Sequence, residues 1–403
     1  MKILYVCHRF PYPPKQGGKI RPFNMIRHLS HDHEVTVVSI ARSDIEAKEG
    51  EGIADFCARY ELAMVNDPMQ TLRMIARLPT PVPSSMGFFF SPHVQRRVRE
   101  LLASERFDLI FVHCSSVAQY VEGVHHIPKI LDFGDMDSQK WLEYARFKPF
   151  PLSLGYEIEG RKLEYAERLL AREFDFCTAT TRAEWETLES YRTGVACDWF
   201  PNGVDSEYFA PSDEPYDPDS LVFVGRMDYY PNQECMFEFC RVTLPAIRAR
   251  RPNAKLCIVG ADPSAAVQRL GRMPGVTVTG SVPDVRPYLQ RAALTVAPLN
   301  IARGTQNKIL ESMAAGVPVV TSALAAGGVD AASPEHFIAV SRTEDYAPAI
   351  LSILENPERR DALARAGRER MLSHHAWDKA MQRMDGIIER CLDIAARRRA
   401  RAA

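Results

Sequence analysis

Residues 302–320, which read A-R-G-T-Q-N-K-I-L-E-S-M-A-A-G-V-P-V-V, bring together side chains suited to binding a nucleotide diphosphate. The polar loop 303–306 is predicted to lead into a short helix carrying Asn307, Lys308 and Glu311, and an apolar strand follows. Free backbone N–H groups at a helix start and a lysine in its first turn suit phosphates. A carboxylate one turn later can accept hydrogen bonds from both hydroxyls of a ribose. The same pattern also fits an ordinary helix–strand unit with a solvated Lys–Glu pair.

Loops that follow other predicted strands hold further candidates, because ligands of an open parallel sheet bind at the carboxyl ends of its strands. Gly17 and Gly18 follow the first strand and would let the backbone approach a phosphate or sugar closely. A turn that needs glycine only for flexibility is the other interpretation. His113 ends a strand, and Gly225-Arg226 follows another. Taken singly, each fits a structural histidine or a surface arginine as readily as a functional group.

Short apolar runs alternate with helical patterns along the whole chain. Most runs are continuous and rich in Val, Ile and Leu, which is typical of strands buried on both faces of a parallel sheet. They lie at 3–7, 35–40, 62–65, 109–113, 129–131 and 174–178, and then at 221–224, 256–259, 276–279, 294–297, 317–321 and 337–340. Helical patterns lie between them, for example at 160–172 and 234–250. This alternation predicts two doubly wound α/β domains.

A domain boundary is predicted at Pro201-Asn202-Gly203, ahead of the Pro- and Asp-rich stretch 211–219. Residues 1–200 and 201–376 would then form the two domains. A long helical segment from Trp377 to about Arg399 follows the second sheet. We expect residues from about 377 to 403 to join the first domain.

The composition predicts a cytosolic enzyme. The chain has 403 residues and a formal net charge of −1, which gives no general reason to bind nucleic acid. Its nine cysteines include no CxxC pair, as expected of reduced thiols. No apolar run approaches the ~18 residues that span a bilayer, and the apolar start is too short for a signal peptide. The absence of a G-x-G-x-x-G motif argues against a dinucleotide oxidoreductase.

Three further features can be explained either by a function or by structure alone. Asp135-Met136-Asp137 looks like a D-x-D metal motif, but hard cations require more oxygen ligands than such a pair supplies. Phe88-Phe89-Phe90 fits core packing better than lipid contact. The arginine-rich stretch 397–401 fits an anionic membrane or a solvated helix end equally well.

Taken together, these motifs resemble the GT-B glycosyltransferases, particularly the retaining family 4 (group 1), over nearly the whole chain. In chain order, the resemblance rests on G-G at 17–18, His113, P-N-G-V-D at 201–205, G-R-M-D at 225–228, V-G-A at 259–261, G-S-V-P-D-V at 280–285 and N-K-I-L-E-S-M-A-A-G-V-P-V-V at 307–320. More narrowly, M-D-Y-Y-P-N at 227–232 and D-M-D-S-Q-K-W at 135–141 are similar to the exosortase (PEP-CTERM)-associated exopolysaccharide sugar transferases.

The resemblance implies two Rossmann-like domains facing each other across a cleft, with the nucleotide-sugar donor in the second and the acceptor in the first. The implied reaction moves a hexose from a UDP- or GDP-linked donor to a saccharide or lipid-linked acceptor, with retention, in exopolysaccharide or cell-surface glycan synthesis. It requires no metal ion and no cofactor besides the nucleotide-sugar. The implied location is cytoplasmic, and the resemblance allows peripheral contact with the inner face of the plasma membrane.

The resemblance also assigns roles to residues. The implied catalytic residues are His113 beside the transferred sugar, with Arg226 and Lys308 at the diphosphate. Glu311 would bind the ribose. The implied donor-binding residues are Gly17, Gly18, Gly225, Arg303, Gly304, Thr305, Gln306, Asn307 and Glu311.

Two departures from the family pattern bear on specificity. Family members usually carry a second Glu, separated from the first by seven residues, and Arg303 stands at that position here. They also usually carry a Lys a few residues after the G-R pair, where this chain has Tyr229-Tyr230-Pro231-Asn232. Two alternatives therefore stay open. One is a GT-B nucleotide-sugar epimerase or hydrolase, and the other is a non-catalytic nucleotide-sugar-binding protein.

Overall fold

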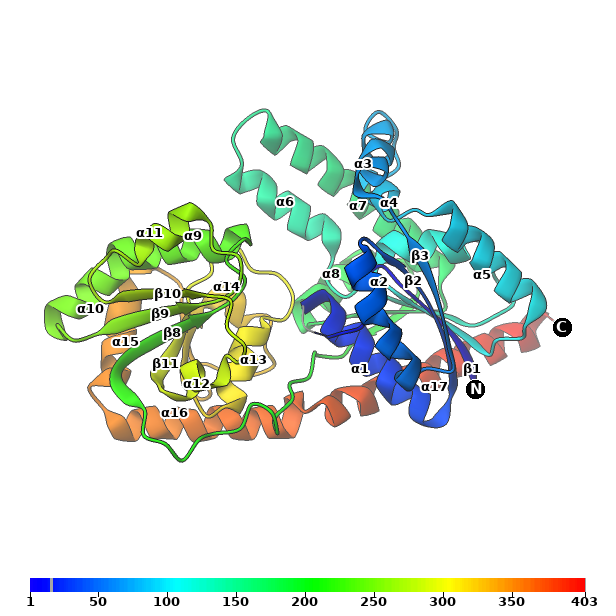
Figure 1. The fold of residues 1–403 in the computed structure, drawn as a ribbon. Helices are drawn as coiled ribbons and strands as arrows, with labels where there is room; N and C mark the ends of the chain where they lie inside the picture. The colour runs from blue at the N-terminus through cyan, green and yellow to red at the C-terminus, as the bar shows by residue number, and fades with distance from the viewer. Residues whose placement is uncertain (15–16, 403) are drawn as a thin grey trace. The chain divides into compact units, whose positions relative to one another are not determined.

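The computed structural model describes residues 1–14 and 17–402, and the chain divides into two compact units. The first unit comprises Met1–Phe200 and Met381–Ala403, and the second comprises Pro201–Ala380. The division falls at the Pro201-Asn202-Gly203 segment that the sequence singles out. Figure 1 shows a sheet in each unit with helices packed over it.

The sheet of the first unit has the strand order β3-β2-β1-β4-β5-β6-β7, and every strand pair is parallel. Its strands are β1 (Lys2–Cys7), β2 (Glu34–Ala41), β3 (Arg59–Met64), β4 (Leu109–His113), β5 (Lys129–Asp132), β6 (Phe176–Ala179) and β7 (Ala196–Trp199). The sequence did not predict β7, because this four-residue edge strand is mostly half-exposed and shows no continuous apolar run.

The sheet of the second unit repeats this plan with the parallel order β10-β9-β8-β11-β12-β13. Its strands are β8 (Asp217–Val224), β9 (Lys255–Val259), β10 (Val276–Gly280), β11 (Ala292–Ala297), β12 (Val319–Ser322) and β13 (Ile338–Val340). In each sheet the order reverses beside the first strand, between β1 and β4 and between β8 and β11. Such switch points are where open α/β sheets bind ligands. The prediction of two Rossmann-like α/β domains is confirmed.

Helices connect the strands in both units (Figure 1). The first unit contains α1 (Gly17–Asp32), α2 (Asp44–Gly50), α3 (Asp67–Ala76), α4 (Ser84–Phe88), α5 (Pro92–Ser104), α6 (Asp137–Phe147), α7 (Leu152–Glu173) and α8 (Arg182–Ser190). The second contains α9 (Tyr230–Glu238), α10 (Leu244–Arg250), α11 (Ala265–Leu270), α12 (Arg286–Gln290), α13 (Asn307–Ala314), α14 (Ala323–Ala326), α15 (Tyr346–Leu354) and α16 (Pro357–Arg370). Helix α17 (Trp377–Ala402) ends the chain.

The helix predicted at 234–250 is interrupted. A π-helical turn, Phe239–Thr243, joins α9 to α10. Such single π turns inside helices are rare, and the sequence pattern did not predict this one.

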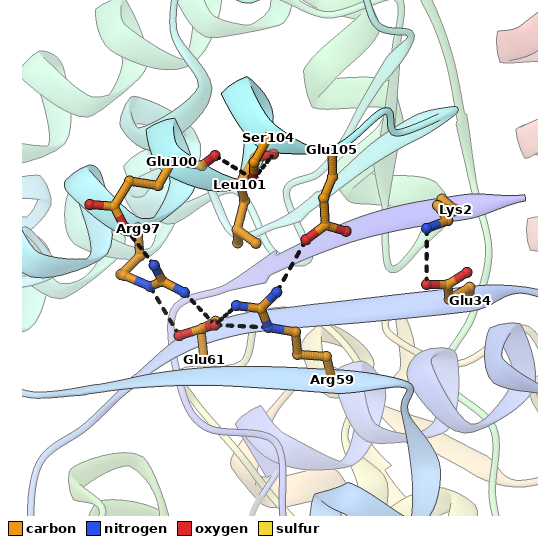
Figure 2. Close-up of polar contacts among 9 residues, drawn as sticks. All are labelled: Lys2, Glu34, Arg59, Glu61, Arg97, Glu100, Leu101, Ser104 and Glu105. Atoms are coloured by element: carbon orange, nitrogen blue, oxygen red, sulfur yellow. Dashed lines mark hydrogen bonds and ion pairs between the residues drawn. The ribbon is translucent and has the colours of Figure 1, made fainter.

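The amino ends of the first strands are joined by ion pairs on the surface (Figure 2). Lys2 at the start of β1 lies 3.3 Å from Glu34 at the start of β2. Arg59 at the start of β3 pairs with Glu61, and its guanidinium also lies 3.1 Å from Glu105. These side chains are partly exposed, and such pairs contribute little to stability. The buried polar groups of this unit, described below, lie at the opposite ends of its sheet, where β4 and β5 end.

Candidate functional site

In the second unit, the loop 303–306 leads into α13 as the sequence predicts. Gly304 adopts a φ of +61°, and Gln306 precedes the helix without a side-chain cap. Gln306 Nε2 instead donates to the carbonyl of Arg303 at 3.0 Å. Because no side chain caps the helix start, the first-turn N–H groups of α13 suit an anion.

The backbone of a neighbouring loop supports this loop directly. A Cβ atom at Gly328 would lie 2.1 Å from the carbonyl oxygen of Gly304. Any side chain at Gly328 would therefore push the loop 303–306 out of place. Contact between main chains therefore helps to position the loop, together with the hydrogen bond from the Gln306 side chain to the Arg303 carbonyl.

Lys308 lies at the centre of a small polar cluster. Its Nζ donates to Asn232 Oδ1 at 2.7 Å, and Asn232 Nδ2 donates to the carbonyl of Arg226 at 2.8 Å. The ammonium also lies 4.5 Å from the centre of the Phe223 ring. Burial lowers the pKa of Lys308 to about 8, and the nearby Glu311 opposes this shift. A phosphate would compensate this incompletely neutralised cation.

Glu311 lies one turn further along α13. Burial raises the pKa of its carboxyl to about 7, and the charge of Lys308 opposes the rise. Ser312, the next residue, is fully buried, and its hydroxyl donates to the carbonyl of Lys308 at 2.7 Å while accepting from Thr295 at 2.9 Å. The helix is thereby fixed to β11, and Glu311 is held beside the switch point of the second sheet.

Arg226 follows β8 and is held by two carboxylates. Its guanidinium donates to Asp228 at 3.1 and 2.7 Å and to Asp262 at 2.8 Å. The hydrogen bond to Asp228 raises the pKa of Arg226. Asp262 has a φ of +56°, an uncommon backbone conformation for a residue with a side chain. A diphosphate that binds Arg226 must therefore compete with these carboxylates.

Close backbone packing also fixes the turn at Gly225. A Cβ at Gly260 would lie 1.8 Å from the Gly225 carbonyl oxygen, and a Cβ at Gly225 would lie 2.8 Å from Asn232 Nδ2 and 3.2 Å from Lys308 Nζ. The structure thus brings Gly225, Arg226 and Lys308 together through Asn232. Sequence reasoning noted Asn232 only as part of a departure from the family pattern.

In the first unit, His113 ends β4 and is oriented by a buried carboxylate. Its Nδ1 lies 2.7 Å from Asp132 Oδ2 at the end of β5. Asp132 also accepts from the Arg21 guanidinium at 2.9 and 3.0 Å and from Thr178 at 2.8 Å. Burial alone would raise the pKa of Asp132, but Arg21 and His113 hold it well below its usual range. An ionised Asp132 holds the proton of His113 on Nδ1 and leaves Nε2 for a ligand.

His8, after β1, lies beside this group. The His8 and His113 rings are 5.6 Å apart, and burial keeps the pKa of His8 well below its usual value. Its Nδ1 is buried without a hydrogen-bond partner in the described part of the chain. Sequence reasoning stopped at Gly17 and Gly18 and did not select His8 or Asp132, although both follow or end predicted strands.

Gly17 and Gly18 form the first turn of α1, so they lie in the helix and not in the loop before it. The rest of the predicted loop includes Lys15 and Gln16, which lie outside the described residues. A Cβ at Gly18 would meet the Arg9 side chain at 3.5 Å, an ordinary contact. The described structure therefore shows no steric requirement for glycine at position 18.

A pocket of about 400 Å³ opens at the carboxyl ends of β1 and β2, and its lining includes His8 and Arg9. Lys19 and Glu46 form an ion pair of 2.6 Å across it, and Arg42 pairs with Asp67. The pocket is polar and nearly balanced in charge, so it suits a hydroxylated ligand better than a strong anion.

The three ambiguous features have different environments. Burial raises the pKa of both Asp135 and Asp137, and no cluster suited to a metal occurs among the described residues. Phe89 and Phe90 pack against the core of the first unit. In the tail, Arg398 pairs with Asp175 and donates to the carbonyl of His125, so this helix end contacts its own unit. Within residues 1–14 and 17–402, no helix is both long and apolar enough to cross a membrane.

Comparison with known proteins gives a family match in the second unit and a shared fold over the whole chain. Residues 218–356 match the family model described as glycosyl transferases group 1. The chain is 24% identical over 211 residues to a GDP-mannose-dependent monoacylated alpha-(1-6)-phosphatidylinositol monomannoside mannosyltransferase of Corynebacterium glutamicum, an alignment that covers 47% of this chain. The chain spans only 55% of the length of that relative.

Two solved structures share the fold over nearly their full lengths. Sucrose-phosphate synthase of Thermosynechococcus elongatus superposes with a TM-score of 0.68 at 17% identity, covering 97% of this chain and 98% of the synthase. Anabaena HepE in complex with UDP-glucose superposes with a TM-score of 0.68 at 14% identity, covering 96% of this chain and 99% of HepE. The chain therefore has the fold of the GT-B glycosyltransferases and carries, in its second unit, the sequence pattern of the group 1 glycosyl transferases.

Proposed function

We propose that this protein is a glycosyltransferase that moves a hexose from a nucleotide-sugar to a saccharide or lipid-linked acceptor. The observation that carries the proposal is the cluster at the switch point of the second sheet. There Lys308 lies against the Gly225–Arg226 turn through Asn232, and Glu311 lies one helical turn further on. This combination of cations, helix start and carboxylate suits a diphosphate joined to a ribose.

In the proposed reaction the protein acts mainly by orientation and charge. Lys308, Arg226 and the first turn of α13 stabilise the charge that develops on the leaving diphosphate. Following the resemblance, we propose that the reaction proceeds with retention, that it requires no metal ion, and that the leaving phosphate helps to deprotonate the acceptor. His113 has Nε2 available for the transferred sugar because Asp132 holds its Nδ1.

The nucleoside of the proposed donor is uridine or guanosine. The Corynebacterium relative is named for GDP-mannose, and HepE was solved with UDP-glucose. Arg303 replaces the carboxylate that the family usually directs at the donor sugar, so the sugar itself is not inferred from those relatives. The narrower resemblance to exosortase-associated transferases supports a role in exopolysaccharide or other cell-surface glycan synthesis. The free cysteines of the described chain support a cytoplasmic location.

Calorimetric titration with UDP, GDP and ADP, in the presence of a metal chelator, tests the donor site. We expect UDP or GDP to bind the wild type, and Glu311→Ala to lose most of that affinity. If the Glu311→Ala variant binds the nucleotide as tightly as the wild type does, Glu311 does not bind the ribose. Failure of all three nucleotides to bind would contradict the proposal.

Turnover separates the two alternatives. An epimerase or hydrolase would consume the nucleotide-sugar without an acceptor, whereas a transferase forms product only when the acceptor is added. Binding without turnover on any member of a broad acceptor panel would favour a non-catalytic protein, which the Arg303 replacement permits. NMR of the product anomer then tests retention.

A further inference from the structure

The pocket at the carboxyl ends of β1 and β2 is not part of the proposed donor site, and its walls combine apolar and charged surfaces. Its volume is about 400 Å³. Ile40 is a buried apolar part of the lining, whereas Ile45 on α2 lines the pocket and is 72% exposed. An isoleucine that lines a cavity and is open to water offers an apolar surface to a ligand.

Helix α2, which forms one wall of this pocket, is fixed at both ends. Ser43 caps its first turn, because the Ser43 hydroxyl accepts from the backbone N–H of Glu46 at 3.1 Å. At the other end, a Cβ at Gly50 would lie 2.3 Å from the ring of Phe10, which is fully buried. Glycine therefore allows the helix end to pack closely on the core. The wall is in place before a ligand binds.

Lys19 is the buried cation of the lining. It is only 7% exposed, and its Nζ lies 2.6 Å from Glu46 Oε1. The other carboxylate oxygen, Glu46 Oε2, accepts from the backbone N–H of Arg42 at 2.9 Å, so Glu46 is held from two sides. An ammonium has three N–H donors, and within residues 1–14 and 17–402 Glu46 is the one polar partner of Lys19. The remaining donors suit the oxygen atoms of a ligand.

The charges of the lining balance one another. Three cationic and three anionic side chains line the pocket, namely Arg9, Lys19 and Arg42 with Glu46, Glu49 and Asp67. A phosphate or carboxylate gains little from such a balanced lining. A hydroxyl group both donates and accepts, so it can bind either kind of side chain. An apolar wall, fixed donors and fixed acceptors together suit a carbohydrate without charge.

The pocket begins beside the implied catalytic histidine. His8 lines the pocket, and its ring lies 5.6 Å from the ring of His113. Strand β1 lies between β2 and β4, so the β2 side of the pocket is two strand spacings from the end of β4. Two such spacings amount to ~10 Å. A single sugar ring does not reach from His113 across this distance.

We propose that the pocket binds the second sugar of an uncharged oligosaccharide acceptor, while the first sugar, which carries the reacting hydroxyl, lies beside His113. Ile45 packs against the C–H face of the second sugar, and Lys19 and Glu49 bind its hydroxyls. This inference rests on the glycosyltransferase function proposed above and adds the length and the charge of the acceptor. The family resemblance implies only that the acceptor binds in the first unit.

Saturation-transfer NMR titrations of the full chain test the proposal. The probes are the disaccharides maltose, cellobiose, lactose and mannobiose, each compared with the methyl glycoside of its non-reducing sugar. We expect at least one disaccharide to bind about tenfold or more tightly than its methyl glycoside, because the second sugar adds hydrogen bonds to charged groups. Its affinity should change less than about twofold between about 0.05 and about 0.5 M salt, because the ligand has no charge to screen.

Substitutions in the lining locate the second sugar. Ile45→Asp should weaken disaccharide binding about tenfold or more, through loss of the apolar contact, and should change methyl glycoside binding less than about twofold. Lys19→Met should have the same selective effect, because it removes the buried donor. Ile75→Asp is the matched control, since Ile75 is 50% exposed on α3 of the same unit and lies outside the lining. It should bind as the wild type does. Urea unfolding checks that each variant keeps the fold.

Several outcomes would overturn the proposal. They are no binding of any probe, equal affinity for each disaccharide and its methyl glycoside, and an equal loss of both kinds of probe in Ile45→Asp. Tighter binding of glucose 6-phosphate than of any disaccharide, weakened by salt, would assign the pocket to an anion instead. The nucleotide titration described above separates this inference from the proposed function. A chain that binds UDP or GDP without preferring a disaccharide keeps its donor site and loses only the acceptor subsite. A chain that prefers a disaccharide but binds no nucleotide keeps the carbohydrate pocket and loses the transferase function.

Discussion

The charged groups at the carboxyl ends of the two sheets differ in how well their charges are compensated. In the first unit, Asp132 is fully buried, but Arg21, Thr178 and His113 satisfy it, and its pKa lies well below the usual range. In the second unit, Lys308 has a pKa lowered to about 8 and Glu311 a pKa raised to about 7, both because of burial. The first arrangement is complete without a ligand, whereas the second leaves charge uncompensated.

This difference indicates different tasks. A satisfied buried network holds an imidazole in one orientation and contributes to stability. An incompletely compensated cation beside an uncapped helix start costs stability in the free protein, and an anionic ligand recovers that cost when it binds. We therefore expect substitutions in the first unit to change folding most, and those in the second to change ligand affinity most.

The largest expected effect is that of Asp132→Asn. The substitution keeps the shape but leaves the Arg21 guanidinium buried without its carboxylate, which typically costs about 3–5 kcal/mol. Urea unfolding followed by circular dichroism measures the loss. Asp67→Asn is the control, because its pair with Arg42 is exposed and worth at most about 1 kcal/mol. Equal effects of the two substitutions would show that the Asp132 network does not contribute specially to stability.

Lys308→Ala should weaken nucleoside diphosphate binding by about 1.5–3 kcal/mol, the range for a hydrogen bond to a charged group. Calorimetry measures the change. The free energy of unfolding should change little, because removing a cation that is costly to bury is offset by leaving Asn232 Oδ1 and Glu311 without their partner. Unchanged affinity would show that Lys308 is not part of the donor site and would contradict the proposed difference between the two units.

The pH dependence of donor affinity follows from the same two pKa values. Below about pH 7 Glu311 becomes protonated and can no longer accept both ribose hydroxyls, and above about pH 8 Lys308 loses its charge. Affinity should therefore be highest between these values and fall by up to about tenfold per pH unit on either side. A nucleotide-sugar is the suitable ligand, because it has no terminal phosphate that titrates near pH 6.

Single substitutions separate the two limbs of this profile. Glu311→Gln should remove the acid limb, and Lys308→Met should remove the alkaline limb. A profile that is flat in the wild type from about pH 6 to about pH 9 would contradict both assignments.

Asn232→Ala should have the smallest effect of these substitutions. Lys308 would lose the acceptor that orients its ammonium, and the Arg226 carbonyl would lose a donor. We expect donor affinity to fall by about 0.5–1.5 kcal/mol, the net value of one hydrogen bond. The double variant Asn232→Ala/Lys308→Ala should bind like Lys308→Ala alone, because the two residues act through each other. Additive losses would show that they act independently.

The sequence predicts the fold well because buried parallel strands are continuous apolar runs. It predicts both ends of β4 correctly. It misses β7, because this strand is half-exposed at the sheet edge and has no continuous apolar run. It also places the second sheet's last-but-one strand two residues early, at Val317, because that residue is buried although the strand starts at Val319. Apolar residues indicate burial, and a buried segment can extend beyond the residues that pair in the sheet.

The candidate site is predictable only in part. Positions at or just after strand ends single out His113 and Arg226, because strand ends share one edge of a sheet. The loop-to-helix pattern at 303–311 singles out Lys308. The partners Asp132 and Asn232 depend on contacts between segments distant in sequence, 19 residues apart for the His113 pair and 76 for the Lys308 pair. No local pattern encodes such pairings, although the polar ends of predicted strands mark where to look.

The main-chain contact between Gly328 and Gly304 has a consequence for how such a protein diversifies. Because a larger residue at position 328 would displace the loop 303–306, that position is closed to side chains. Sugar specificity can then change within the loop only while the packing of Gly328 on Gly304 is kept.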